Sequence, residues 1–93
     1  MLNVNLKFTG LVRKRMGVNQ MEYAFDGSSL AELLEAFFNR YDIQDLILDE
    51  NGEILPYSRI VVNGRFSYLV GNMETPIQDG DLVVFIRPYV VAF

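Results

Sequence analysis

SLAELLEAFFNRY, residues 29–41, is the stretch that decides the fold class. Its large apolar residues recur every three or four positions, which places them along one side of a helix. Ser29 and Glu32 have the spacing of a capping box, in which each side chain binds the other residue's backbone N–H. The stretch therefore predicts a helix from about residue 30 to about residue 40. The apolar stripe consists of Leu30, Leu33, Leu34, Phe37 and Tyr41.

The residues before this helix alternate between apolar and polar, which is the period of a strand with one buried face. One alternating segment contains Val4, Leu6 and Phe8, and the other contains Met21, Tyr23 and Phe25; Asp26-Gly27 forms the turn into the helix. The basic residues 13–15 lie between the two segments. They are expected at the solvated tip of a hairpin, with docking of an acidic partner as the alternative.

The residues after the helix consist of short apolar segments separated by turn residues. An apolar run occupies residues 46–48, and strands are expected at residues 58–62, 66–70 and 82–86. Asn63-Gly64 is a strong signal for a tight hairpin turn. The order hairpin, helix and further strands predicts an α+β fold. We expect a mixed sheet of four to five strands covered by one main helix, in a single domain, residues 1–93.

The residues that lie in phase on their own elements form the predicted core between helix and sheet. Each strand contributes its alternate residues, and the helix contributes its stripe. The predicted core consists of Val4, Leu6, Phe8, Leu30, Leu33, Leu34, Phe37, Ile60, Val62, Val83 and Phe85.

The composition excludes several kinds of active site. The chain has no cysteine and no histidine, so it lacks a thiol nucleophile, a disulfide and the commonest general base and metal ligand. Residues 49–53 have a faint likeness to a calcium loop but lack the distal glutamate. Asp79 and Asp81 flank a glycine, which is typical of a turn. We therefore expect no enzyme activity, no catalytic residue, no metal and no cofactor.

The charge and the hydropathy limit the partners. Twelve acidic and eight basic residues give a net charge of −4, which argues against duplex nucleic acid and against an anionic membrane surface. The N-terminus alternates apolar with polar residues and shows no signal-peptide run. No apolar stretch approaches the about 20 residues that a membrane span needs. We expect a cytoplasmic protein.

The last predicted strand is apolar on both faces. Val83 and Phe85 lie on one face, and Leu82, Val84 and Ile86 lie on the other. A single helix covers one face, so the second face is either covered by loops or is a contact surface. We expect a partner-binding patch of Arg59, Val61, Val84 and Ile86 on the face opposite the helix. The alternative is an ordinary half-covered sheet.

Four segments in order resemble a known family over almost the whole chain. They are GSSLAELL at residues 27–34, LDENGE at 48–53, VVNG at 61–64 and TPIQDGD at 75–81. The sequence resembles the small sulfur-carrier proteins of the MoaD/ThiS type, and it is nearer to MoaD, the small subunit of molybdopterin synthase. The resemblance implies that the α+β fold is of the β-grasp (ubiquitin-like) type, in which the first and last strands are parallel and central.

The resemblance also implies a chemistry at the C-terminus that the residues here do not match. In such carriers a Gly-Gly tail enters an ATP-dependent activating enzyme, is adenylated and becomes a thiocarboxylate. Glycine suits this passage because it has no Cβ. Here the corresponding positions hold Val91 and Ala92, with Phe93 beyond. The fold is thus expected to carry over, and the sulfur-transfer residues are not.

We expect a MoaD-like protein that acts as a non-catalytic protein-binding module or pathway subunit. The expected partner resembles an activating enzyme or a synthase large subunit. The apolar tail residues Tyr89, Val90, Val91 and Phe93 are predicted to bind a partner or to form a homodimer through the C-terminal strand. The alternatives are a functional sulfur carrier with an atypical C-terminus and a ligand- or nucleic-acid-binding β-grasp domain.

Overall fold

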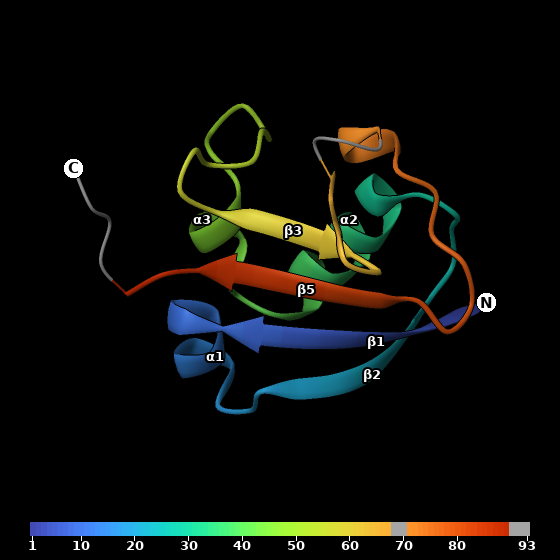
Figure 1. Cartoon of the computed structure of the whole chain (residues 1–93), viewed down its shortest axis with the longest axis horizontal. Coiled ribbons are helices and arrows are strands. Elements are labelled where there is room, and N and C mark those ends of the chain that lie inside the picture. Colours follow the sequence, from blue (N-terminus) through green and yellow to red (C-terminus); the bar gives the residue numbers. More distant parts are fainter. Residues whose placement is uncertain (68–70, 90–93) are drawn as a thin grey trace.

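A computed structural model describes residues 1–67 and 71–89 of the chain (Figure 1). Among these residues strands and helices alternate as far as α2; then α3 follows α2, β4 follows β3, and a single turn of 3₁₀ helix precedes the last strand. In chain order the elements are β1 (Leu2–Thr9), α1 (Gly10–Met16), β2 (Gln20–Phe25), α2 (Leu30–Arg40), α3 (Gln44–Ile47), β3 (Arg59–Val62), β4 (Arg65–Phe66), the 3₁₀ helix (Asn72–Glu74) and β5 (Leu82–Arg87).

The five strands form one mixed sheet in the order β2-β1-β5-β3-β4. The central strands β1 and β5 are parallel, and every other neighbouring pair is antiparallel. Parallel strands need a crossover connection, and here the chain between them passes behind the sheet as α2 (Figure 1). The predicted α+β, ubiquitin-like β-grasp fold is confirmed, including the parallel central strands that the resemblance implied.

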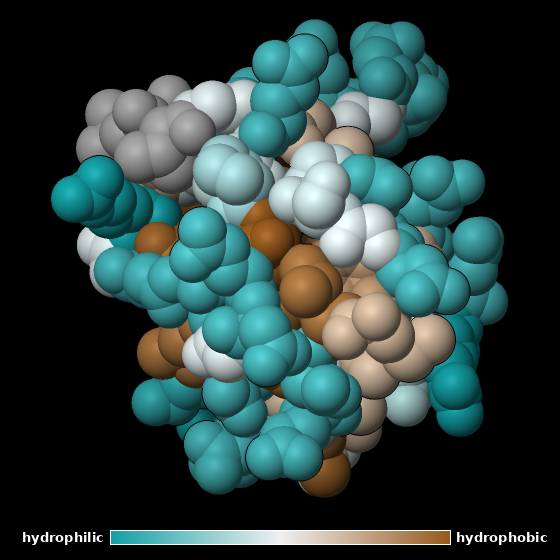
Figure 2. All heavy atoms as spheres, turned by 90° about the vertical axis from the view of Figure 1, so that its right-hand side faces the viewer, coloured by the Kyte–Doolittle hydropathy of each residue, from teal (hydrophilic) through white to brown (hydrophobic). Residues whose placement is uncertain are grey.

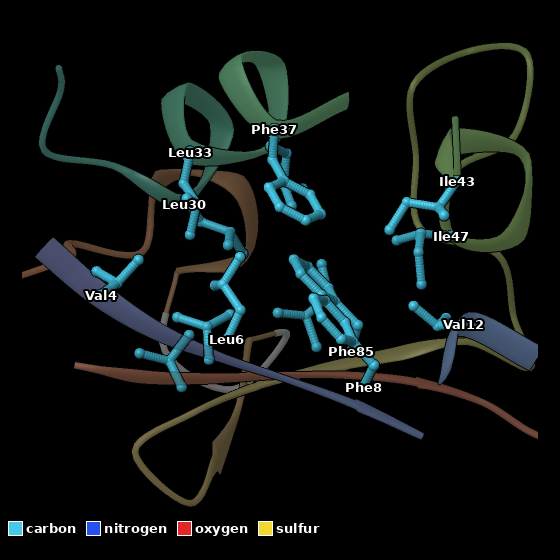
Figure 3. Close-up of a cluster of buried hydrophobic side chains, with 14 of the residues drawn as sticks. Val4, Leu6, Phe8, Val12, Leu30, Leu33, Phe37, Ile43, Ile47 and Phe85 are labelled. Atoms are coloured by element: carbon cyan, nitrogen blue, oxygen red, sulfur yellow. The ribbon is translucent and has the colours of Figure 1, made fainter. Parts of the chain in front are cut away.

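All eleven residues of the predicted core are buried between the helices and the sheet (Figure 3). Phe8, Phe37 and Phe85 stack at its centre, with ring centroids 5.8–6.0 Å apart. The core also includes buried residues that the prediction did not name. These are Val12, Phe25, Ile43, Leu46, Ile47 and Ile77.

Helix α2 begins and ends at the predicted residues. The Ser29 hydroxyl accepts a hydrogen bond from the Glu32 backbone N–H, at 3.3 Å, as a capping residue does. The return bond differs from the predicted one, because the Glu32 carboxylate accepts from the Ser28 backbone N–H and the Ser29 hydroxyl instead of the Ser29 backbone N–H. The cap therefore includes one residue more than the capping-box pattern specifies.

Residues 13–15 are exposed in the connection between the antiparallel strands β1 and β2, as predicted, but they belong to helix α1 and not to a simple hairpin turn. The helix's one fully buried side chain is Val12, which inserts between the sheet and α3 (Figure 3). Gly10 begins the helix with φ +59°, and a Cβ built there would lie 1.9 Å from the Arg87 carbonyl oxygen. Glycine is thus required where β1 turns into α1 beside the end of β5.

The second half of the chain contains less strand than expected. Residues 46 and 47 end helix α3, and Leu48 makes only an isolated bridge with Ile54. Strand β4 is two residues long and ends at Phe66, whereas a strand was expected over residues 66–70, of which 68–70 lie outside the described residues. The Asn63-Gly64 turn is as predicted, with φ of 50° and 83°.

Candidate protein-binding surface

The sheet face that points away from α2 is the surface on which the predicted patch lies. Val61 pairs directly with Val84, and Arg59 pairs with Ile86, across the antiparallel β3–β5 ladder. Directly paired residues point to the same face, so the structure brings all four predicted residues together. Each of the four is half-buried.

Two further apolar residues extend this patch and were not among the predicted site residues. Phe66 pairs with Val61 across the β3–β4 hairpin and is 37% exposed. Leu82, which is 41% exposed, lies on the same face two residues before Val84. Counting outward from the two-residue turn would have placed Phe66 opposite Val61. We call Val61, Phe66, Leu82, Val84 and Ile86 the apolar strip.

The remainder of this sheet face is polar. Asn3, Asn5 and Lys7 of β1 and Gln20 and Glu22 of β2 alternate with core residues and are exposed. Seen from the end of the molecule that holds the N-terminus, the surface is mainly hydrophilic, and hydrophobic side chains gather in small areas between hydrophilic ones (Figure 2). The apolar strip is therefore confined to β5, β3 and β4, which is the half of the sheet away from β2.

Arg59 supplies a positive charge at the border of the apolar strip. Its guanidinium donates hydrogen bonds to the carbonyl oxygens of Pro56 and Ser58, at 2.5 and 2.7 Å. These bonds hold the side chain against the loop that leads into β3. The charge is thus fixed at one end of the strip, beside Ile86.

The chain leaves the sheet after β5 at a tightly fixed point. Arg87 lies with its guanidinium 4.2 Å from the centre of the Tyr57 ring and donates to the Leu46 carbonyl oxygen at 3.3 Å. Gly10 bridges the Arg87 backbone from the other side. The next residues lead away from the sheet at the end where α1 lies (Figure 1), and Tyr89 is 55% exposed there. The predicted tail residues Val90, Val91 and Phe93 lie outside the described residues.

The acidic clusters that could have bound a metal serve as turns. The Asp49 carboxylate accepts from the backbone N–H groups of Asn51 and Glu53, and Asp79 accepts from the Asn3 N–H. Asp81 accepts from the Asn63 side-chain amide and from the Gln78 N–H. Within residues 1–67 and 71–89, no three acidic side chains lie close enough to hold a metal ion.

None of the helices in the described part of the chain is long and apolar enough to cross a membrane. The longest, α2, has 11 residues.

The chain is similar in sequence to a known small protein, although no family model matches it. Small archaeal modifier protein 3 of Haloferax volcanii is 26% identical over 88 residues, which cover 94% of this chain and 96% of that protein. The similarity thus extends over nearly the whole length of both proteins.

Solved structures confirm the fold. The solution structure of the Haloferax volcanii HVO 2177 protein has a TM-score of 0.79 and 25% identity, covering 98% of this chain and 87% of that one. A chain of the BexX/CysO complex from Amycolatopsis orientalis has a TM-score of 0.76 and 17% identity, covering 96% and 99%. The second likeness shows the fold alone, and that structure is of a complex between two proteins.

Proposed function

We propose that this chain, a ubiquitin-like β-grasp protein similar to the small archaeal modifiers, is a non-catalytic binding module of the MoaD-like sulfur-carrier lineage. Its partner is another protein, of the kind of an activating enzyme or a synthase large subunit. The observation that carries the proposal is the apolar strip on β5, β3 and β4.

The physical argument rests on the contrast within one sheet face. Exposed single apolar residues are common on protein surfaces, but here Val61 pairs with both Val84 and Phe66. Leu82 and Ile86 flank Val84 on the same face of β5, so the five residues are neighbours on three adjacent strands. The side chains are half-buried or about 40% exposed, so a partner would remove more apolar surface from water. Burial of apolar area stabilises a complex by about 25 cal/mol per Å² before the costs of association. The polar half of the face and Arg59 supply the rim that interfaces usually have.

The substitution Val61→Asp tests this proposal. Val61 lies at the centre of the strip between Val84 and Phe66, and a carboxylate there would have to lose water on binding. We expect the affinity for the activating enzyme from the same genome, measured by isothermal titration calorimetry, to fall at least about tenfold, which corresponds to ~1.4 kcal/mol. The same measurement with a homologue of the synthase large subunit covers the second kind of partner.

Ala24→Asp is the matched control for Val61→Asp. It adds the same charge to the same sheet face, but on β2, where Ala24 is exposed and pairs with Asn3, away from the apolar strip. Unchanged binding by Val61→Asp, or equal weakening by both variants, would reject the apolar strip as the docking site. A ¹H–¹⁵N spectrum like that of the wild type is required of each variant, and sedimentation of the wild type tests for a homodimer.

The second candidate function is that of a carrier or modifier whose own C-terminal carboxyl group is activated. The name of the sequence relative, a small archaeal modifier protein, favours it. The 93 residues contain no two adjacent glycines, which is the feature that favours the first proposal. Mass spectrometry of the protein after incubation with the activating enzyme and ATP separates the two. A C-terminal adenylate or thiocarboxylate would establish the second function and overturn the first.

A further inference from the structure

A shallow hollow lies beside helix α1, at the end of the molecule from which the C-terminal residues leave the sheet. Its lining includes Arg13 and Lys14 of α1, Val18 and Asn19 of the following loop, and Tyr89. None of the described residues that line it is acidic. In a chain with a net charge of −4, the hollow is a local region of positive charge.

The two cations in the hollow have no partner within residues 1–67 and 71–89. Arg13 and Lys14 are both exposed, and neither makes an ion pair or a side-chain hydrogen bond there. Arg15, the third basic residue of the run, differs: it pairs with the Asp45 carboxylate and donates to the Asp42 carbonyl oxygen. Among the described residues, Arg15 is therefore the one basic side chain of the three that is paired, and Arg13 and Lys14 are exposed at the hollow.

Helix α1 holds these cations in a fixed place relative to the C-terminal exit. Val12, on the same helix as the two cations, is fully buried in the core, and Gly10 at the start of the helix lies against the Arg87 carbonyl oxygen. The helix ends at Gly17, whose φ of +78° turns the chain back toward β2. Val12 and Gly10 thus attach the helix that carries both cations to the core and to the end of β5.

Apolar and aromatic surface adjoins the two cations. Val18 is 46% exposed and Tyr89 is 55% exposed, and both line the hollow. A complementary ligand carries negative charge for Arg13 and Lys14 and an apolar group for Val18 and Tyr89. A segment of protein in which Asp or Glu residues alternate with an aliphatic residue has both.

We propose that this hollow binds an acidic segment of the protein partner, so that the partner grips the body of the domain beside its C-terminal residues. The inference deepens the proposed function by naming the chemistry of a second contact. Gln20 of the hollow pairs with Lys7 on the open sheet face, so one partner can reach both the hollow and the apolar strip. The local positive charge orients an acidic partner that the net charge would otherwise repel.

The charges favour a peptide over a nucleic acid. Affinity for a duplex rests largely on many contacts to phosphates, and within the described residues this hollow offers two cations that make no ion pair. The twelve acidic residues of the chain would also repel a long polyanion. An acidic peptide places a few charges locally, which suits two cations.

A titration with a defined probe tests the inference. The probe is a fluorescein-labelled synthetic peptide of sequence EELEELEE, and its matched control is QQLQQLQQ. We expect the acidic peptide to bind at low salt, measured by fluorescence anisotropy, and the glutamine peptide not to bind. In ¹H–¹⁵N spectra the shifts should lie on Arg13, Lys14, Val18 and Tyr89. The double variant Arg13→Glu/Lys14→Glu should bind at least about tenfold more weakly.

Arg40→Glu/Arg65→Glu is the control variant for this pair. Both arginines are exposed, and the change in net charge is the same. Equal weakening by the two double variants would overturn the inference, because the peptide would then respond to overall charge. So would shifts confined to the apolar strip, or tighter binding of a single-stranded oligonucleotide of thymidine. Arg13→Gln/Lys14→Gln repeats the test without reversing charge, should the first variant not fold.

The inference and the proposed function fail in different ways. If Val61→Asp weakens binding of the full partner and Arg13→Glu/Lys14→Glu does not, the apolar strip stands and the hollow is rejected. If neither variant weakens partner binding, both are rejected. If the hollow variant alone weakens binding, the partner docks on α1 and the sheet face is not the interface.

Discussion

Val83 and Val84 are adjacent in β5 and are chemically identical, yet they lie in opposite environments. Val83 is fully buried beneath the helices, whereas Val84 is half-buried on the open face of the sheet. What differs is coverage: α2, α3 and α1 all place side chains over the core face (Figure 3), and no helix of the described residues covers the other face (Figure 1). Apolar composition alone thus does not distinguish the residues that stabilise this fold from those available to a partner.

The largest expected effect comes from removing a ring on the core face. Phe85 is fully buried and stacks on Phe8 and Phe37, at 5.8 Å between ring centroids in both cases. Phe85→Ala should lower the free energy of unfolding by ~3–5 kcal/mol, because the cavity cannot close. Ile86→Ala, one residue along on the open face, should cost about 1 kcal/mol because Ile86 is already half-exposed.

Urea denaturation of the two variants measures this difference. Equal destabilisation by Phe85→Ala and Ile86→Ala would mean that the open face is covered as well as the core face. The apolar strip would then be structural, and the comparison between the two faces would fail.

Helix α1 contributes Val12 to the core and exposes Arg13 and Lys14 to a partner. A substitution at Gly10 tests how the helix is attached to the end of β5. Gly10→Ala places a Cβ against the Arg87 carbonyl oxygen and forces a left-handed φ of +59° on alanine. We expect a loss of more than ~2 kcal/mol, since the left-handed conformation alone costs roughly 1–2 kcal/mol and the close approach adds to it.

Gly17→Ala separates the two contributions at Gly10. Gly17 has a φ of +78° and nothing lies within 4 Å of a Cβ built there, so only the conformational cost of roughly 1–2 kcal/mol applies. Thermal unfolding of both variants gives the comparison. A Gly10→Ala variant as stable as Gly17→Ala would show that α1 can move away from β5, and the fixed position of its cations would be lost.

The parts of the fold that were predictable are those with a repeated pattern. Helix α2 has a stripe over three turns and a cap, so its ends at Leu30 and Arg40 followed from the sequence. The core strands alternate over several residues, so the period of two identified their buried faces. The parallel pairing of β1 with β5 was implied by the family resemblance and not by this pattern. Short helices give no such repetition. Helix α1 has seven residues with one buried side chain, and α3 has four residues.

The site was predictable only in part, for a related reason. Alternation along β3 and β5 placed Val61 and Val84 on one face, and the antiparallel pairing then joined them. Phe66 joins the strip through a hairpin register, and the hollow beside α1 brings together residues 13, 18 and 89. Contacts between residues far apart in the chain depend on the tertiary arrangement, which a local pattern does not encode.

The smallest expected effect distinguishes the basic residues of α1 from one another. Arg15 pairs with Asp45, but the two side chains are 42% and 64% exposed. Exposed pairs contribute little because water and salt screen them, so Arg15→Gln should cost at most about 0.5 kcal/mol at low salt. The loss should vanish at about 1 M NaCl, where the Debye length is about 3 Å. Lys14→Gln, which breaks no contact among the described residues, should leave the unfolding free energy unchanged at either salt concentration. Urea denaturation at both salt concentrations measures these values, and the quantity compared is the difference in unfolding free energy between the two variants.

If Lys14→Gln destabilises the domain as much as Arg15→Gln does, the basic run of α1 is a structural feature of the helix as a whole. The two exposed cations would then have a role in folding, and the contrast between a stabilising side and a binding side would no longer hold for α1.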